Sequence, residues 1–264
     1  MAAYKNLKIE KEGGIAHVSL DRGDGRNALS YSLMKELTDC ANELSSNTEI
    51  NCIVLSGEGD SFSVGADLKD KDFLKGDKSS LERREAFKVG PDMCQAWESL
   101  EQITIASIEG YCLGGGLALA VACDFRISSQ DAIFRLPEIP LGMNMSWQSN
   151  PRINALIGPA RTKELVILGE EVIGEKAYDW GLVQKICDKG KALEESNNLA
   201  KKIIKLPPLA VRMSKVSINA AANALNYNSS YMDRDQYLLT AFTEDREEAI
   251  KAFFEKREPD FKGK

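Results

Sequence analysis

The chain has 264 residues, of which 43% are hydrophobic and 28% charged, and its formal net charge is −6 at pH 7. The composition is typical of a soluble globular protein, and the length allows one large domain or two small ones. The negative charge argues against nucleic acid or an anionic membrane as the main partner, and no stretch reaches the apolar length of a membrane span. Because residues 1–10 resemble neither a secretory signal nor a transit peptide, we expect a cytoplasmic protein, or an organelle-matrix protein if the chain is a processed form.

Six cysteines and one histidine restrict the available chemistry. None of the cysteines forms a CxxC pair and most have apolar neighbours, which predicts buried thiols in a reducing compartment. His17 lies in an alternating run with no second histidine, which favours a strand-surface position over a catalytic or metal-binding role. We therefore expect no metal site.

The first part of the chain predicts strands and a crossover helix. Residues 7–20 alternate on both sides of Gly13-Gly14, which is typical of a β-hairpin. Ser30 is placed to cap a helix whose apolar residues recur at helical spacing over 33–44. An apolar strand follows at 52–55, and the order strand–helix–strand favours parallel pairing.

Two loops of small residues dominate the middle of the chain. The first is 61–68, followed by a charge-dense stretch, 69–84, that predicts a surface loop with a frayed helix. A helix is predicted to begin after Pro91. An apolar strand, 103–108, then leads into the glycine turn and buried helix of 110–124. Glycine permits a sharp turn and a close approach to main-chain N–H groups, and a helix that begins there is partly positive at its start. Main-chain N–H groups at the start of such a helix can therefore stabilise a developing negative charge.

The second half carries one irregular loop and then helices. Loop 134–142 holds a carboxylate, Glu138, between two prolines, and the unusual segment 143–150 follows. Helices are predicted at 152–157, 159–169 and 175–180, and a last strand at 183–187. After about residue 189 only helical patterns appear, which indicates a lid or an oligomer interface. Asp124 is expected to have a structural role.

Three stretches resemble the motifs of the crotonase superfamily, the enoyl-CoA hydratase/isomerase family: Ser63–Leu68, Gly110–Asp124 and Pro137–Gly142. Asn27-Ala28-Leu29 and Ala252–Arg257 are also similar to family segments, in the right order. The resemblance covers essentially the whole chain. It implies acyl-CoA thioester substrates and no cofactor, because coenzyme A enters as part of the substrate. It also implies a homotrimer or a hexamer built as a dimer of trimers.

The fold implied by the resemblance is α/β, a crotonase-like spiral of ββα repeats with a C-terminal helical trimerisation region. On this interpretation residues 1–190 form the spiral core and residues 191–264 form the helical oligomerisation region.

The resemblance also implies a mechanism. It places the thioester oxygen between the backbone N–H groups of Ala66 and Gly115, which would stabilise an enolate. Family hydratases use two glutamates: one matches Glu138, and the other, in the pattern Gly-Gly-Gly-x-Glu, falls on Ala118. Because a single carboxylate can move a proton from C2 to C4, the sequence favours a Δ3-Δ2 enoyl-CoA isomerase with Glu138 as the acid/base.

Further contacts follow from the same resemblance. Arg26, Ala28 and Leu29 would meet the pantetheine and phosphate end of coenzyme A, and Leu68 would lie beside the adenine. Phe253 and Lys256 match residues that family members supply from a neighbouring subunit, although Lys256 is equally explained as a solvated helix charge.

Segment 143–150 leaves the function open. Met143 and Trp147 either shape the acyl site or are ordinary core residues. If a polar side chain of this segment orients water, the chain is instead a hydratase, a lyase, acting on an unusual acyl-CoA. A third hypothesis is a non-catalytic acyl-CoA binder.

Overall fold

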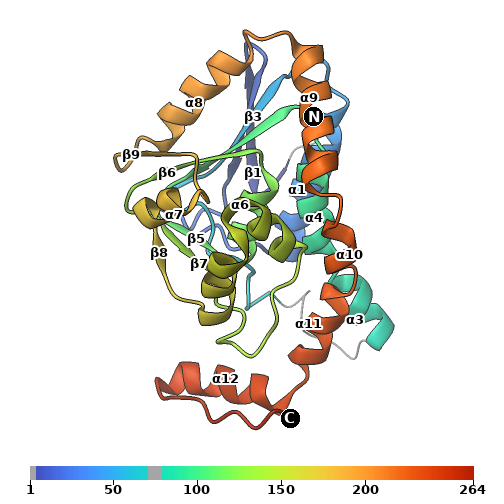
Figure 1. Ribbon diagram of the computed structural model, residues 1–264, viewed down its shortest axis with the longest axis vertical. Coiled ribbons are helices and arrows are strands. Elements are labelled where there is room, and N and C mark those ends of the chain that lie inside the picture. Colours follow the sequence, from blue (N-terminus) through green and yellow to red (C-terminus); the bar gives the residue numbers. More distant parts are fainter. Residues whose placement is uncertain (1–3, 71–78) are drawn as a thin grey trace.

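A six-stranded sheet forms the centre of the protein, whose computed structural model describes residues 4–70 and 79–264. Its strand order is β1-β2-β3-β4-β6-β9 (Figure 1). The strands are β1 Leu7–Glu12, β2 Ile15–Leu20, β3 Cys52–Gly57, β4 Ile103–Ile108, β6 Phe125–Ser129 and β9 Lys185–Cys187. The β1–β2 hairpin is antiparallel and every other neighbouring pair is parallel, as the sequence predicts.

A second, three-stranded sheet was not predicted. It has the order β5-β7-β8 and consists of β5 Tyr111–Leu113, β7 Ile133–Arg135 and β8 Val172–Ile173. Strands of two or three residues are too short for their alternation to be recognised in a sequence. This small sheet matters for the site because β5 leads directly into the glycine turn.

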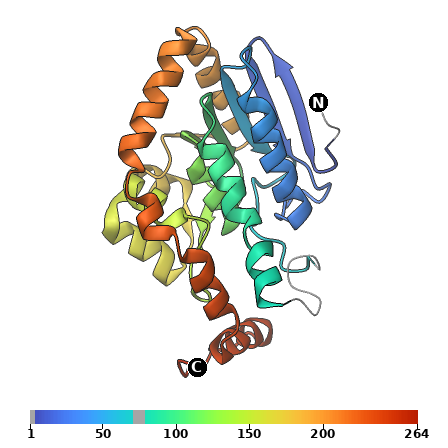
Figure 2. The same cartoon turned by 90° about the vertical axis from the view of Figure 1, so that its right-hand side faces the viewer.

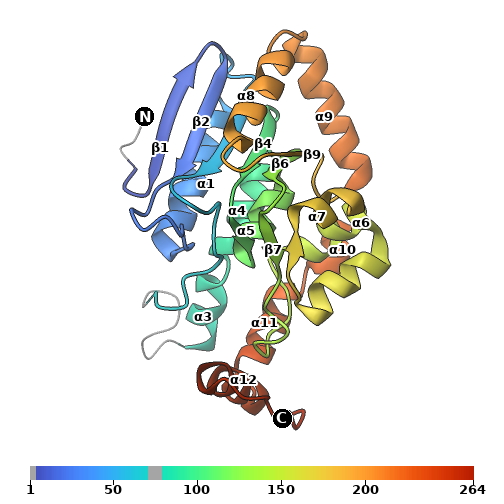
Figure 3. The same ribbon diagram turned by 90° about the vertical axis from the view of Figure 1, so that its left-hand side faces the viewer.

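Helices cover both faces of the main sheet. The described helices of the first two-thirds of the chain are α1 Tyr31–Ser45, α3 Ser80–Ala86, α4 Val89–Glu98, α5 Gly115–Ala122, α6 Ser149–Lys163, the π-helical turn η1 Glu164–Leu168, and α7 Gly174–Trp180. The tail adds α8 Ala192–Ile203, α9 Pro208–Ala222, α10 Asn226–Ser230, α11 Asp233–Ala241 and α12 Glu244–Glu255. Figures 2 and 3 show α1 and α4 on one side of the sheet and α8 on the other.

Most predicted elements of the core are confirmed. The side chain of Ser30 caps α1 by accepting from Leu33 N–H at 3.2 Å. α6 is interrupted at Gly158, where φ is 76°, so two helical segments are present as expected. The helix predicted to begin after Pro91 begins earlier, at Val89; a proline in the first turn is tolerated because its missing N–H has no helical partner there.

The described part of the charge-dense stretch contains one regular element, α3. α3 begins with a capping box between Ser79 and Glu82 and buries none of its side chains, whereas 71–78 lie outside the described residues.

α8 packs its Ala200 and Ile203 on the sheet, beside Val54 and Ile105. The proposed division between residues 190 and 191 stays a prediction.

A buried ion pair joins the helical tail to the sheet. Lys215 of α9 donates to Asp124 Oδ2 and to the carbonyl of Gln102, each at 2.7 Å. Asp124 Oδ2 also accepts from the N–H of Thr104 at 2.7 Å. Asp124 therefore has the structural role expected of it. Among the described residues no helix combines the length and the apolar character that crossing a bilayer requires.

Candidate active site

The two loops of small residues lie side by side. The N–H of Ser63 donates to the carbonyl of Tyr111, and the N–H of Leu113 donates to the carbonyl of Ser63, each at 2.9 Å. This parallel ladder aligns loop 61–66 with β5. A Cβ added to Gly65 would lie 3.3 Å from the amide nitrogen of Gly115. The fold thus brings the loop of Ala66 against the start of α5.

Two backbone donors face one cavity without an internal acceptor. Within the described part of the chain, neither the N–H of Ala66 nor that of Gly115 donates a hydrogen bond, whereas the N–H of neighbouring Asp67 donates to Leu29 at 3.0 Å. Ala66 and Gly115 both line a cavity of about 100 Å³. Gly115 is the first residue of α5, where the helix dipole adds partial positive charge. An oxygen in this cavity would therefore meet donors suited to a negative charge.

The turn before α5 requires glycine. Gly114 has φ 49° and ψ −119°, a conformation that residues with a Cβ rarely adopt. A Cβ at this position would also lie 2.8 Å from Glu138 Oε1. Gly114 N–H donates to the carbonyl of Arg135 at 2.9 Å, which fixes the turn to β7. The glycine turn is therefore what allows Glu138 to approach the start of α5.

Glu138 is the acid of the cavity. Its loop is closed by tight turns, in which the N–H groups of Leu141 and Met143 donate to the Glu138 carbonyl at 3.1 and 2.9 Å. The residue as a whole is half-buried, but its Oε2 is shielded from solvent and has no hydrogen-bond partner in the described chain. Burial raises the pKa of Glu138 to about 7. A buried carboxyl with one unpaired oxygen and a pKa near neutral pH is suited to move protons.

The other cavity walls are mostly apolar. They consist of glycines, aliphatic and aromatic residues together with two further polar side chains, and the full lining is Val64, Gly65, Ala66, Leu68, Phe87, Gly114, Gly115, Pro137, Glu138, Leu141, Met143, Met145, Ser146, Trp147 and Tyr237. Six residues singled out from the sequence meet here: Ala66, Leu68, Gly115, Glu138, Met143 and Trp147.

Three of the expected coenzyme A contacts lie next to this cavity without lining it. The carbonyl of Arg26 accepts from Val64 N–H at 3.0 Å, and Leu29 N–H donates to the Gly65 carbonyl at 2.8 Å. The Arg26 side chain is exposed and Ala28 is half-buried, but Leu29 is fully buried.

Three other positions lie away from the cavity lining. Phe253 and Lys256, at the end of α12, are exposed and do not line the cavity within one subunit. Ala118 is fully buried one turn into α5 and supplies no carboxylate.

Tyr237 of α11 is the cavity residue that sequence reasoning missed. Its ring packs on Phe87 with centroids 5.0 Å apart, and its hydroxyl has no hydrogen-bond partner among residues 4–70 and 79–264. Burial raises the pKa of Tyr237, so the phenol remains a donor at neutral pH. A single tyrosine in a helical tail carries no local signal of such a position.

Comparison with known proteins identifies the family. The sequence model for enoyl-CoA hydratase/isomerase matches residues 10–264. The chain belongs to the enoyl-CoA hydratase/isomerase family. It is 32% identical to a crotonyl-CoA hydratase of Syntrophomonas wolfei over 98% of each chain, and 35% identical to a probable enoyl-CoA hydratase of Bacillus subtilis, covering 90% and 91% of the two.

Solved structures agree on the fold. The crystal structure of an enoyl-CoA hydratase from Mycobacterium avium subsp. paratuberculosis superposes with a TM-score of 0.87 at 22% identity, covering 98% of this chain and 100% of that one. The α/β crotonase fold expected from the sequence is thereby confirmed. The isomerase and hydratase alternatives share this fold, so the choice between them depends on the cavity.

The buried carboxyl of Glu138 predicts a stability effect that does not depend on any reaction. Because the pKa is raised from 4.5 to about 7, ionisation of Glu138 destabilises the native protein progressively as the pH rises through this range. We expect Glu138→Gln to increase the free energy of unfolding by on the order of 3 kcal/mol at pH 8 and by nearly nothing at pH 4. Denaturant unfolding at both pH values measures this.

Glu170→Gln, at an exposed position, is the control and should change stability little at either pH. An equal effect of Glu138→Gln at pH 4 and pH 8 would contradict the burial of an ionisable carboxyl at position 138.

Proposed function

We propose that the protein is an enoyl-CoA isomerase that shifts a double bond from C3–C4 to C2–C3. The observation that carries this proposal is that Glu138 is the single carboxylate among the described residues lining a largely apolar cavity, opposite two unpaired backbone donors. A double-bond shift needs one group that removes a proton and returns it. Hydration needs in addition a water molecule held for attack at C3.

The proposed reaction has two proton transfers. Glu138 takes a proton from C2 of a 3-enoyl thioester, and the electron pair of that C–H bond moves onto the thioester carbonyl to form a dienolate. The N–H groups of Ala66 and Gly115 stabilise the negative oxygen. The protonated Glu138 then gives its proton to C4, the C3–C4 double bond becomes a single bond and C2–C3 becomes double. Glu138 ends as the carboxylate with which it began.

The environment of Glu138 suits both transfers. A carboxyl with a pKa of about 7 is a stronger base than an ordinary glutamate, and its conjugate acid still gives up a proton readily. Apolar walls favour both proton transfers, because water in the cavity would compete with Glu138 as a proton donor to the dienolate and would solvate the carboxylate.

Hydration is the second candidate because relatives at 30–35% identity are named hydratases. In that case Tyr237 or Ser146, the other polar side chains of the cavity lining, would have to hold the attacking water. The two functions are separated by the mass of the product: isomerisation leaves it unchanged, whereas hydration adds one water.

For coenzyme A, we propose contacts on both sides of a subunit boundary. Arg26, Ala28, Leu29 and Leu68 lie around loop 64–66 and would hold the nucleotide and pantetheine. Phe253 and Lys256 would act on a neighbouring subunit in a homotrimer or a dimer of trimers. This is supported by the large exposed apolar side chains of the tail, for instance Leu209, Leu239 and Phe254, which are 70%, 74% and 77% exposed in a single chain.

Removal of the carboxylate tests the proposal directly. We expect Glu138→Gln to lower kcat/KM on a short 3-enoyl-CoA by about 10²–10⁴-fold, because the described cavity lining holds no other carboxylate that could take up the proton. Mass spectrometry of the product, in H2O and in D2O, distinguishes isomerisation, hydration and simple C2 exchange. Retention of most isomerase activity would defeat the assignment of Glu138.

The pH dependence gives a second test. Glu138 must be ionised to accept the first proton, so kcat/KM is expected to reach a plateau about one pH unit above 7 and to fall by about tenfold per pH unit well below 7. The unperturbed value of 4.5 would place this midpoint far lower. A profile that stays flat down to pH 5 contradicts a buried, raised-pKa base.

Lys256 tests the contribution of a second subunit. We expect Lys256→Asn to raise KM several-fold with kcat unchanged, since a phosphate contact affects ground state and transition state alike. Asparagine is chosen because Lys256 has φ 53° and asparagine tolerates this conformation. Lys262→Asn is the control, and equal KM values in the two variants would assign Lys256 to solvent.

A further inference from the structure

Trp147 of the cavity wall and Gln148, the next residue, have left-handed backbone conformations without being glycine. Trp147 has φ 62° and Gln148 has φ 58°, immediately before α6 begins. Each such residue costs on the order of 1–3 kcal/mol, and it persists only where neighbouring contacts enforce it. Both residues belong to segment 143–150, whose role the sequence leaves open.

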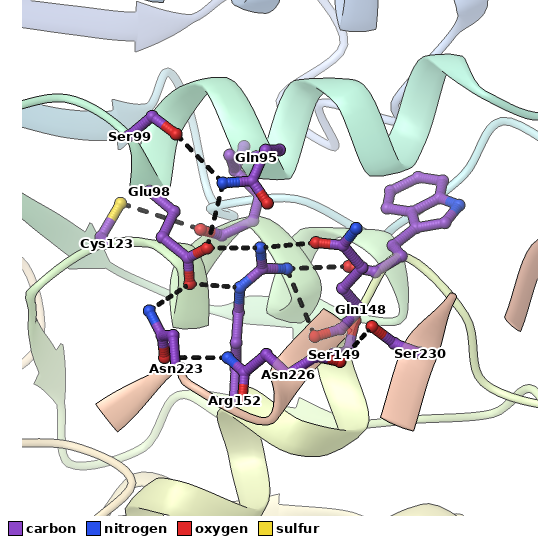
Figure 4. A network of polar contacts seen from close by, with 12 residues as sticks. Gln95, Glu98, Ser99, Cys123, Gln148, Ser149, Arg152, Asn223, Asn226 and Ser230 are labelled. Carbon is purple, nitrogen blue, oxygen red and sulfur yellow. Dashed lines mark hydrogen bonds and ion pairs between the residues drawn. The ribbon is translucent and has the colours of Figure 1, made fainter. Parts of the chain in front are cut away.

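Arg152 is the main contact that enforces this conformation. Its Nη1 donates to the carbonyl of Trp147 at 2.9 Å and to that of Gln148 at 3.3 Å (Figure 4). From the other side, Asp233 of α11 accepts the N–H of Gln148 at 2.6 Å. The two left-handed residues are thus held through their own backbone atoms.

A buried ion pair fixes the guanidinium in turn. Arg152 Nε and Nη2 donate to Glu98 Oε1 and Oε2 at 2.7 and 3.0 Å, and the two side chains are only 3% and 14% exposed. Asn223 of α9 adds a hydrogen bond to Glu98 Oε1 at 3.1 Å (Figure 4). The planar guanidinium can serve the carboxylate and the two carbonyls at once, which an ammonium group cannot.

The conformation at 147 directs the indole into a narrow space between two helices. A Cβ added to Gly90 of α4 would lie 2.1 Å from the Trp147 ring, and one added to Gly115 of α5 would lie 2.3 Å from it. Trp147 is 8% exposed and lines the cavity. The ring therefore packs directly on the residue whose N–H faces the cavity.

We propose that the Glu98–Arg152 ion pair holds Trp147 against Gly115, so that Arg152 is a positioning residue and Trp147 determines how much water and how large an acyl group the cavity admits. The proposal rests on the proposed function for its kinetic consequences alone, because the position of the indole can be measured without any reaction.

The first experiment measures that position in solution. Acrylamide quenching of Trp147 is obtained as the difference between each protein and its Trp147→Phe counterpart, which removes the signals of Trp97 and Trp180. We expect Arg152→Lys to raise the quenching constant of Trp147 at least twofold, because lysine keeps the charge but cannot bridge Glu98 and the carbonyls. An unchanged constant in a folded Arg152→Lys protein would overturn the proposal.

Lys215→Arg is the matched control. Its ion pair with Asp124 is buried to the same degree, with side chains 4% and 16% exposed, and the hydrogen bonds of Lys215 go to Asp124 and Gln102 rather than to residues 147–148. We expect no change in Trp147 quenching there. If Arg152→Lys fails to fold, Glu98→Gln weakens the same pair more mildly and must increase quenching in the same direction.

The second experiment follows the reaction. We expect Arg152→Lys to lower kcat several-fold, to increase the hydrated fraction of the product, and to move the acidic limb of the pH profile toward lower pH as water reaches Glu138. Among the described residues, Tyr237 of α11 interacts electrostatically with Glu138, and Arg246 of α12 donates to the carbonyl of Leu141 in the Glu138 loop; both are unchanged in this variant. A purely structural role would reduce activity without moving the pH profile or the product ratio.

A double-mutant cycle then identifies the path of the effect. If Arg152 acts through the indole, the Arg152→Lys and Trp147→Phe effects are strongly non-additive, whereas fully additive effects would overturn the proposal. Failure of the proposed function has a different signature: Glu138→Gln would retain activity while the quenching difference persisted.

Discussion

The burial of the Glu138 carboxylate is the constraint around which this site is built. Glu138 Oε2 has no donor in the described chain, and the apolar walls that surround it make its ionisation unfavourable. A carboxyl in open solvent would be ionised at lower pH and would be a weaker base. The fold therefore accepts a local loss of stability, as active sites commonly do, and offsets it elsewhere in the sheet and its helical layers.

The two N–H groups that share the cavity with this carboxylate, those of Ala66 and Gly115, belong to the main chain, which explains both the strength and the limits of sequence reasoning. Loops 61–68, 110–124 and 137–142 were predicted to cooperate, and the structure brings them around one cavity. Glycine at 114 and the start of α5 leave a recognisable local pattern, because only certain residues allow the turn. The N–H donors themselves leave no side-chain signature, so small residues were all that the sequence could offer.

Other features depend on contacts between residues far apart in the chain, and they were not predicted for that reason. Tyr237 reaches the cavity from α11, and Glu98 meets Arg152 from α4. Each is an ordinary helical residue in its own segment, and only tertiary packing gives it a neighbour. The short strands β5, β7 and β8 escaped notice because two or three residues carry no periodicity. Phe253 and Lys256 were singled out, yet a single chain leaves both at the surface.

Identity of 30–35% with proteins named hydratases is stronger support for the fold and for thioester chemistry than for the particular reaction. The reaction depends on what surrounds the enolate. A carboxylate at position 118 would be fully buried on α5, where its ionisation would be unfavourable. The chain instead has alanine there and an indole against Gly115. Both features suit the proposed isomerisation, because that reaction needs no second acid to direct a water molecule.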